Sequence, residues 1–293
     1  MRLLGELLPS EELWLWPDCP DPGEVEMLVA WRMRRDDLAT FTNLTHILSM
    51  GAGTEQWQRE GSPDVAIVRL ADPNMSTEMA AYALHWVVHF QRDFHVRFGA
   101  DDLAEWGERT APPPSEYPVG ILGFGTIGRR IGEAFQHLGY PVNAWSRSGT
   151  DAEGVVSFAG LKELASFLAA SNAVISVLPN TDATRGLLTA ERFGQFRPGA
   201  TFVNIGRGSV VDSETDLLAA VDAGQLGAVV LDVTNPEPPA QDTPLLAHPS
   251  VVITPHISGT TQIASAAELI AANIERIRAG EAPFPLVDKS VGY

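Results

Sequence analysis

The chain has 293 residues, of which 45% are apolar, and it carries a formal net charge of −17. This acidic balance argues against binding to nucleic acid or to anionic membranes, because both would be repelled. No apolar run is long enough for a transmembrane helix, and the acidic N-terminal segment does not read as a signal peptide. Cys19 is the only cysteine, so an internal disulfide is impossible. We therefore expect a cytoplasmic protein, and the length favours two domains.

The first part of the chain alternates strand-like and helix-like segments, which predicts a parallel sheet. Short apolar runs bounded by Pro, Asp or Gly predict strands, and a short helix is expected at 35–41. The turn Gly51-Ala52-Gly53 follows one of these strands and could present N–H groups to a ligand, although the residues alone favour a plain turn. The predicted strands span residues 12–16, 27–31, 45–50 and 65–70.

A long helix is predicted from Ser76 to about Phe98. Ser76 is a suitable N-cap, and its wide apolar face predicts burial between domains or in a subunit interface. His85 and His89 are four residues apart, a spacing that can hold a metal ion. No Cys lies nearby in the sequence, so we interpret them as packing or interface residues and expect no metal. A proline-rich connector, 111–115, follows the helix.

After the connector the pattern becomes regular and predicts a doubly wound parallel sheet, whose ligands bind beyond the carboxyl ends of the strands. Asp212 and Gly224 are the expected N-cap and C-terminal glycine of one helix. A final helix, about 263–279, is placed to cross back onto the first segment. The predicted strands are 119–124, 142–146, 173–178, 201–205, 228–233 and 251–254, and the helices are 126–138, 161–169, 190–196 and 212–223.

The glycine turn Gly123-Phe-Gly-Thr-Ile-Gly128 joins a predicted strand to a predicted helix. In this context the spacing is typical of a dinucleotide site. Gly123 permits the tight turn, Gly125 permits close approach of a pyrophosphate, and Gly128 permits packing of the helix on the strand. The phosphates are expected at the helix N-terminus, where free N–H groups and the helix dipole favour an anion.

The end of the second strand predicts which dinucleotide binds. An NAD site needs an acid about 20 residues beyond the glycines to bind the ribose 2′-hydroxyl. Here the strand ends in Ser146-Arg147-Ser148, and the nearest acid, Asp151, lies too far along the loop. A guanidinium with two hydroxyls suits a 2′-phosphate. We predict NADPH, with NADH as a weaker alternative.

Three charged residues follow three late strands. Arg207 follows 201–205, Glu237 follows 228–233, and His256 follows 251–254. Each alone is consistent with an ordinary loop residue. Their shared position at one edge of the sheet predicts a catalytic group.

With these motifs the sequence resembles the D-isomer-specific 2-hydroxyacid dehydrogenases over residues 45–293. The typical motifs are the glycine turn, Leu178-Pro-Asn-Thr181, Arg207-Gly, Asp232-Val with Glu237-Pro, and Pro255-His256. More closely it is similar to the glyoxylate/hydroxypyruvate reductase A branch, on residues 50–53, 78–82 with 85–86, 145–148 and 287–293.

The resemblance implies an α/β fold of two Rossmann-like, doubly wound parallel-sheet domains with a cleft between them. The first is expected to be smaller and discontinuous. We expect residues 1–75 with 262–293 to bind the substrate and 76–261 to bind the dinucleotide. The resemblance also implies a homodimer, with the helix at 76–98 in the interface. The family's first domain usually opens with a strand and then a helix, whereas 3–8 resembles the end of that helix. We expect either a late start or a sheet that is one strand short.

The roles implied by the resemblance agree with the chemistry of the side chains. His256 is the expected proton donor, and Glu237 would stabilise its imidazolium form. Arg207 would bind the substrate carboxylate and polarise the carbonyl. The resemblance makes the N–H groups of Ala52 and Gly53 a second carboxylate clamp. The remaining contacts are Asp232 with the nicotinamide carboxamide; Thr126, Ile127, Leu178 and Pro179 with the cofactor; and Trp31 with the substrate, unless Trp31 is a core residue.

The expected reaction is reduction of glyoxylate to glycolate, or of hydroxypyruvate to D-glycerate, with NADPH. One alternative is a dehydrogenase for a different 2-oxo acid. Another is a dinucleotide-sensing binding protein without catalysis, against which the three charged residues argue.

Overall fold

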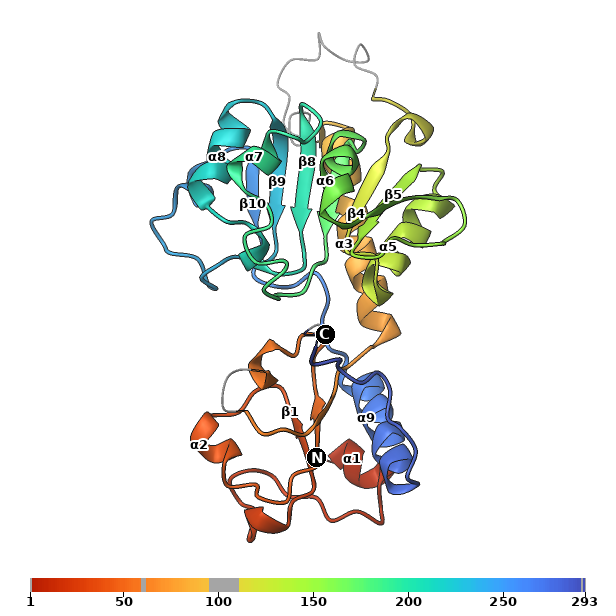
Figure 1. The fold of residues 1–293 in the computed structure, drawn as a ribbon, viewed down its shortest axis with the longest axis vertical. Coiled ribbons are helices and arrows are strands. Elements are labelled where there is room, and N and C mark those ends of the chain that lie inside the picture. The colour runs from red at the N-terminus through yellow and green to blue at the C-terminus, as the bar shows by residue number, and fades with distance from the viewer. Residues whose placement is uncertain (1, 59–61, 95–110, 291, 293) are drawn as a thin grey trace. The chain divides into compact units, whose positions relative to one another are not determined.

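The computed structural model describes residues 2–58, 62–94, 111–290 and 292. The chain divides into two compact units, residues 1–75 with 261–293 and residues 76–260. Each unit has a parallel sheet of its own, with three strands in the first and seven in the second (Figure 1). This confirms the predicted α/β class with two parallel sheets. The cleft between the domains stays a prediction.

The first unit is built on the strands β1 (Met27–Ala30), β2 (His46–Ser49) and β3 (Ala66–Val68), in that order. One face packs against the last helix, α9 (Ile263–Arg278), through a cluster that includes Leu48, Val68 and Ile270. The last helix therefore crosses back onto the first segment, as predicted. The opposite face buries Ile47 and Trp57. The short helices α1 (Arg2–Leu7) and α2 (Arg35–Leu38) complete this unit.

The strand predicted at 12–16 is wrong. Residues 12–15 have no regular structure, and Trp14 and Leu15 are exposed by 48% and 62%. Trp16 instead packs on Phe41, with ring centroids 5.2 Å apart. Among the described residues this run pairs with no strand, and it forms a connecting segment that Trp16 anchors.

The long helix α3 spans Pro73–Gln91, so the predicted start at Ser76 is three residues late. Pro73 occupies the first turn, where its missing N–H costs nothing, and Asp72 accepts a hydrogen bond from the N–H of Asn74 at 2.8 Å. Asp93 has a positive φ of 54° just beyond the end of the helix. Residues 95–98 of the predicted helix lie outside the described part of the chain.

The second unit has the strand order β10-β9-β8-β7-β4-β5-β6. The chain builds outward from β4 to one edge and then from β7 to the other, so the order reverses between these two neighbours. This confirms the doubly wound topology. The strands are β4 (Val119–Leu122), β5 (Val142–Ser146), β6 (Val155–Ala159), β7 (Ala173–Ser176), β8 (Ala200–Asn204), β9 (Leu226–Leu231) and β10 (Val251–Ile253). The helices are α5 (Thr126–His137), α6 (Gly160–Ala169), α7 (Ala190–Phe193) and α8 (Glu214–Asp222).

Two local predictions in this unit need correction. The edge strand β6 was not predicted; its residues are half-buried or exposed, Val156 is 56% exposed, and Ser157 interrupts its apolar residues. The N-cap of α8 is Ser213, whose Oγ accepts a hydrogen bond from the N–H of Asp216, rather than Asp212. Gly224 follows α8 with a φ of +71°, as a C-terminal glycine should. Within the described residues, no helix has both the length and the apolarity to cross a membrane.

Candidate active site

The predicted site residues of the second unit lie at one edge of its sheet. Six of the predicted segments lie beyond the carboxyl ends of the strands, in the spatial order β10, β9, β8, β7, β4 and β5. They hold His256; Asp232 and Glu237; Arg207; Leu178 and Pro179; the glycine turn; and Ser146 to Ser148. In an open parallel sheet this is the edge where ligands bind, beside the point at which the strand order reverses.

The glycine turn lies between β4 and α5, with Thr126 and Ile127 as the first residues of the helix. Gly123 has a φ of +105°, and a Cβ on Gly128 would lie 2.1 Å from the carbonyl oxygen of Gly123. Both positions therefore require glycine. A Cβ on Gly125 would meet no atom within 4 Å. Gly125 thus borders open space at the start of the helix, which is the cradle that a dinucleotide pyrophosphate requires.

Leu178 connects this turn to the next segment along the edge. A Cβ on Gly123 would lie 3.1 Å from Cδ2 of Leu178. A Cβ on Gly206 would lie 2.6 Å from the carbonyl oxygen of Leu178. On the other side of the turn, Ser146 ends β5 and donates to the carbonyl oxygen of Gly149 at 2.9 Å. Arg147 and Ser148 are exposed directly after it. These two residues have the chemistry and the exposure that recognition of a 2′-phosphate needs.

Arg207 is held by the glycines on either side of it, of which the sequence analysis named only Gly208, as part of the Arg-Gly motif. A Cβ on Gly208 would lie 2.1 Å from the carbonyl carbon of Thr234, and a Cβ on Gly206 would lie 2.6 Å from the carbonyl oxygen of Leu178. The backbone on both sides of Arg207 therefore packs directly against the segments that contain Leu178 and Thr234. Its guanidinium Nη1 donates to the carbonyl oxygen of Gly206 at 2.7 Å. The spacing Gly-Arg-Gly is the sequence signal for this tight packing.

Glu237 and His256 come together although they follow different strands. The Oε1 atom of Glu237 lies 2.6 Å from the Nδ1 atom of His256, and each side chain is 43% exposed. A carboxylate at Nδ1 selects the tautomer of the ring and leaves Nε2 available for proton transfer. The pair is therefore a carboxylate–imidazole couple that is open to solvent.

Asp232 is buried and organises the backbone around His256. The N–H groups of three successive residues donate to it: His256 to its carbonyl oxygen at 3.0 Å, Ile257 to Oδ1 at 2.8 Å and Ser258 to Oδ2 at 2.8 Å. The Oδ1 atom also accepts from the hydroxyl of Thr254 at 2.6 Å. Of the two carboxylate oxygens, Oδ2 has the spare acceptor capacity that a carboxamide N–H would need.

Tyr82 of α3 extends this network; the sequence analysis included it in the motif 78–82 but assigned it no role. Its hydroxyl lies 2.5 Å from the Oγ1 atom of Thr254. Burial raises the pKa of the Tyr82 phenol, the hydrogen bond with Thr254 lowers it, and the charge of Asp232 raises it further. Because Thr254 donates its hydroxyl proton to Asp232, the phenol donates to Thr254. The available sequence signal was its position four residues after Glu78 on one helix face.

The turn Gly51-Ala52-Gly53 belongs to the first unit. A Cβ on Gly51 would lie 2.8 Å from the ring of Trp31, so the indole lies directly against the turn. Trp31 is 52% exposed, which excludes the alternative that it is a core residue. Within the described residues, the N–H groups of Ala52 and Gly53 have no acceptor. The turn therefore presents two N–H donors beside an exposed aromatic ring.

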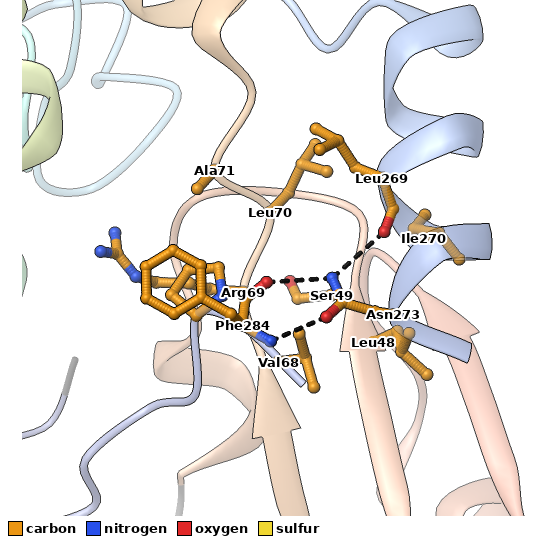
Figure 2. Close-up of a pocket in the computed structure, with 11 residues that line it drawn as sticks. Leu48, Ser49, Val68, Arg69, Leu70, Ala71, Leu269, Ile270, Asn273 and Phe284 are labelled. Carbon is orange, nitrogen blue, oxygen red and sulfur yellow. Dashed lines mark hydrogen bonds between the residues drawn. The ribbon is translucent and has the colours of Figure 1, made fainter. Parts of the chain in front are cut away.

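A separate cavity of about 170 Å³ lies in the first unit between the ends of β2 and β3 and the helix α9 (Figure 2). Its walls are mainly apolar. Asn273 bridges it, because its side chain donates to the carbonyl oxygens of Leu269 and Phe284 and accepts from the N–H of Phe284. None of the predicted site residues lines this cavity.

Comparison with known proteins identifies the family of this chain. The family model described as D-isomer specific 2-hydroxyacid dehydrogenase, NAD binding domain, matches residues 95–258. A glyoxylate/hydroxypyruvate reductase A from Serratia proteamaculans is 35% identical over 300 residues, covering 99% of this chain and 94% of the relative. This chain belongs to the D-isomer specific 2-hydroxyacid dehydrogenase family.

Two solved structures of such dehydrogenases resemble it closely. The enzyme of Xanthobacter autotrophicus Py2, in complex with NADPH and MES, has a TM-score of 0.93 and 36% identity, covering 100% of this chain and 94% of that one. An NADPH-dependent glyoxylate/hydroxypyruvate reductase from Sinorhizobium meliloti, in complex with NADP and sulfate, has a TM-score of 0.87 and 26% identity, covering 100% and 96%. The predicted family is confirmed, and the chain is an NAD(P)-binding oxidoreductase of this dehydrogenase family.

Proposed function

We propose that the protein reduces a short 2-oxo acid, glyoxylate or hydroxypyruvate, with NADPH, and forms glycolate or D-glycerate. The observation that carries the proposal is the 2.6 Å contact between Glu237 and His256 at the edge that also holds the glycine turn. The names of the Serratia and Sinorhizobium relatives support the substrate class. The cofactor supplies a hydride to the carbonyl carbon.

The chain's own residues stabilise the negative charge that hydride transfer creates on the carbonyl oxygen. His256 donates a proton from Nε2 to the carbonyl oxygen, and Glu237 stabilises the imidazolium form before this transfer. Arg207 binds the substrate carboxylate, which a protein with a net charge of −17 would otherwise repel. The N–H groups of Ala52 and Gly53 bind the same carboxylate, and Trp31 limits the size of the substrate.

The cofactor site fits NADPH better than NADH. The pyrophosphate is bound by the glycine turn and the start of α5, lined by Thr126, Ile127, Leu178 and Pro179. The 2′-phosphate is bound by Ser146, Arg147 and Ser148. Asp232 accepts a hydrogen bond from the nicotinamide carboxamide at Oδ2. In this proposal the second unit binds the dinucleotide and the first unit binds the substrate.

A substrate panel with NADPH and NADH in parallel tests the proposal. Purified protein should oxidise NADPH with glyoxylate or hydroxypyruvate at least about tenfold faster than with larger 2-oxo acids, and more slowly with NADH. Product analysis should give glycolate or D-glycerate. Binding of NADPH without turnover of any 2-oxo acid would contradict the proposal and indicate a dinucleotide-sensing protein.

The proposed assembly is a homodimer formed through α3. Trp86 and Phe90 of this helix are stacked, with ring centroids 6.0 Å apart, and both are partly exposed. Such an aromatic surface suits a subunit interface. Light scattering should give twice the mass of the chain, and the mass of a single chain would contradict it.

A further inference from the structure

His256 adopts a backbone conformation that needs support from other elements. Its φ of +55° lies in the left-handed region, which among the described non-glycine residues only Asp93 shares. A non-glycine residue keeps such a conformation only when its surroundings enforce it. The segment 254–260, which contains His256, is therefore shaped by contacts outside itself.

Two side chains of α3 hold this segment at its two ends. Tyr82 lies 2.5 Å from the hydroxyl oxygen of Thr254. Glu78 accepts hydrogen bonds at Oε2 from the N–H of Thr260 at 2.9 Å and from its hydroxyl at 2.7 Å. Because Glu78 and Tyr82 are four residues apart, they project from one face of the helix.

The direction of the hydrogen bonds links Tyr82 to Asp232. The hydroxyl proton of Thr254 is donated to Oδ1 of Asp232 at 2.6 Å, so the Oγ1 atom can only accept from Tyr82. Asp232 in turn accepts from the N–H groups of residues 256, 257 and 258. Removal of the phenol hydroxyl would leave Thr254 free to turn away from the carboxylate that shapes the His256 backbone.

We propose that Glu78 and Tyr82 form a positioning clamp, through which α3 fixes segment 254–260 and orients the His256 imidazole toward Glu237. Neither residue needs to touch substrate or cofactor, since both act through Thr254, Asp232 and Thr260. The inference rests on the proposed function only in that His256 transfers the proton. The orientation of His256 is a property of the chain itself and is measurable without turnover.

Tyr82→Phe removes the donor with little change in volume. It should lower kcat about tenfold, with unchanged KM and Kd for NADPH, because misplacement of a catalytic group affects the chemical step most. Thr254→Val should lower kcat at least as much, and Thr254→Ser, which restores the hydroxyl, should recover most of it. Tyr140→Phe is the matched control. Its hydroxyl donates to Gln91 of α3 at 2.6 Å, without a contact to segment 254–260.

The measurement pairs steady-state kinetics with NMR of the histidine ring nitrogens, in which His256 is assigned from His256→Asn. The clamp predicts that Tyr82→Phe shifts the His256 signals and lowers kcat, while Tyr140→Phe changes neither. If the wild type reduces no 2-oxo acid, the proposed function fails, and the NMR comparison alone decides the clamp. Unshifted His256 signals in Tyr82→Phe, or a Thr254→Ser variant as impaired as Thr254→Val, would overturn it.

Discussion

Two turns at the same edge of the seven-stranded sheet reach unusual backbone conformations by opposite means. The turn 123–128 relies on glycines, with a positive φ at Gly123 and no room for a side chain at Gly128. The segment 254–260 places a histidine at a φ of +55° and holds it with Asp232, Tyr82 and Glu78 from distant parts of the chain. A turn that presents only backbone can be encoded locally, whereas a turn that must present an imidazole needs tertiary support.

The largest expected effect comes from breaking the glycine turn. Gly128→Ala places a Cβ 2.1 Å from a carbonyl oxygen. It should lower the free energy of unfolding by about 3 kcal/mol or more and weaken NADPH binding at least about 100-fold. Gly125→Ala is the control, because its Cβ meets no protein atom. It should keep the stability of the wild type and lose NADPH affinity alone, as seen by thermal unfolding and fluorescence titration. Equal stability of the two variants would contradict this difference.

The second-largest effect is expected from removal of the His256 imidazole, which segment 254–260 presents. His256→Asn keeps a residue type that tolerates a positive φ but removes the proton donor. It should lower kcat about 10²- to 10⁴-fold while NADPH still binds. Glu237→Gln should cost less, because the amide still contacts Nδ1 without its charge. Stopped-flow assays of NADPH oxidation measure both variants. A His256→Asn enzyme with more than about a tenth of the wild-type kcat would remove His256 from the proposed chemistry.

A third variant tests whether Arg147, which is adjacent to Ser146 and Ser148 in the sequence, recognises the 2′-phosphate of NADPH. Arg147→Ala should raise KM for NADPH about tenfold to 100-fold, the equivalent of one charge-assisted contact, and leave KM for NADH unchanged. Arg130→Ala is a matched control. Arg130 is also an exposed arginine, and its Nη1 lies 3.5 Å from Glu133 on α5. The proposed role of Arg147 is wrong if both cofactors lose affinity equally.

The smallest effect should come from a long-range contact that is partly open to solvent. Arg278 of α9 bonds Glu11 at 2.8 Å and also bonds Glu26. Its hydrogen bond lowers the pKa of Glu11. Because the pKa is lower in the folded state, this stabilisation is present above the unfolded value of about 4.3 and is lost as pH falls through the folded value.

Glu11→Gln should therefore reduce the free energy of unfolding by only about 0.2–1 kcal/mol at pH 7, because solvent and salt screen the pair. The difference from wild type should shrink as pH falls below about 4. Chemical denaturation at several pH values measures it. Glu6→Gln, which removes a more exposed pair with Arg2, is the control and should change the free energy of unfolding by less than Glu11→Gln does. A difference in the free energy of unfolding that grows as the pH falls would contradict the predicted direction.

The sequence by itself determined the features that depend on local chemistry. The glycine turn, Arg147 in place of an acid and the strand–helix alternation of the second unit follow from residue types and their spacing. The strand β4 is buried at every position, whereas the residues of the unpredicted strand β6 are half-buried or exposed and Ser157 interrupts its apolar residues. The same reasoning failed at 12–16, because an apolar run becomes a strand only when another strand is available to pair with it.

Only the tertiary structure decided how the predicted site residues are held. The contact of Glu237 with His256, the N–H groups gathered around Asp232 and the roles of Tyr82 and Glu78 join segments up to 182 residues apart. Hydrogen bonds of this kind depend on which elements pack together, and no local pattern records them. Gly206 and Gly208 show the same limit, since their need to be glycine arises from the backbones of Leu178 and Thr234.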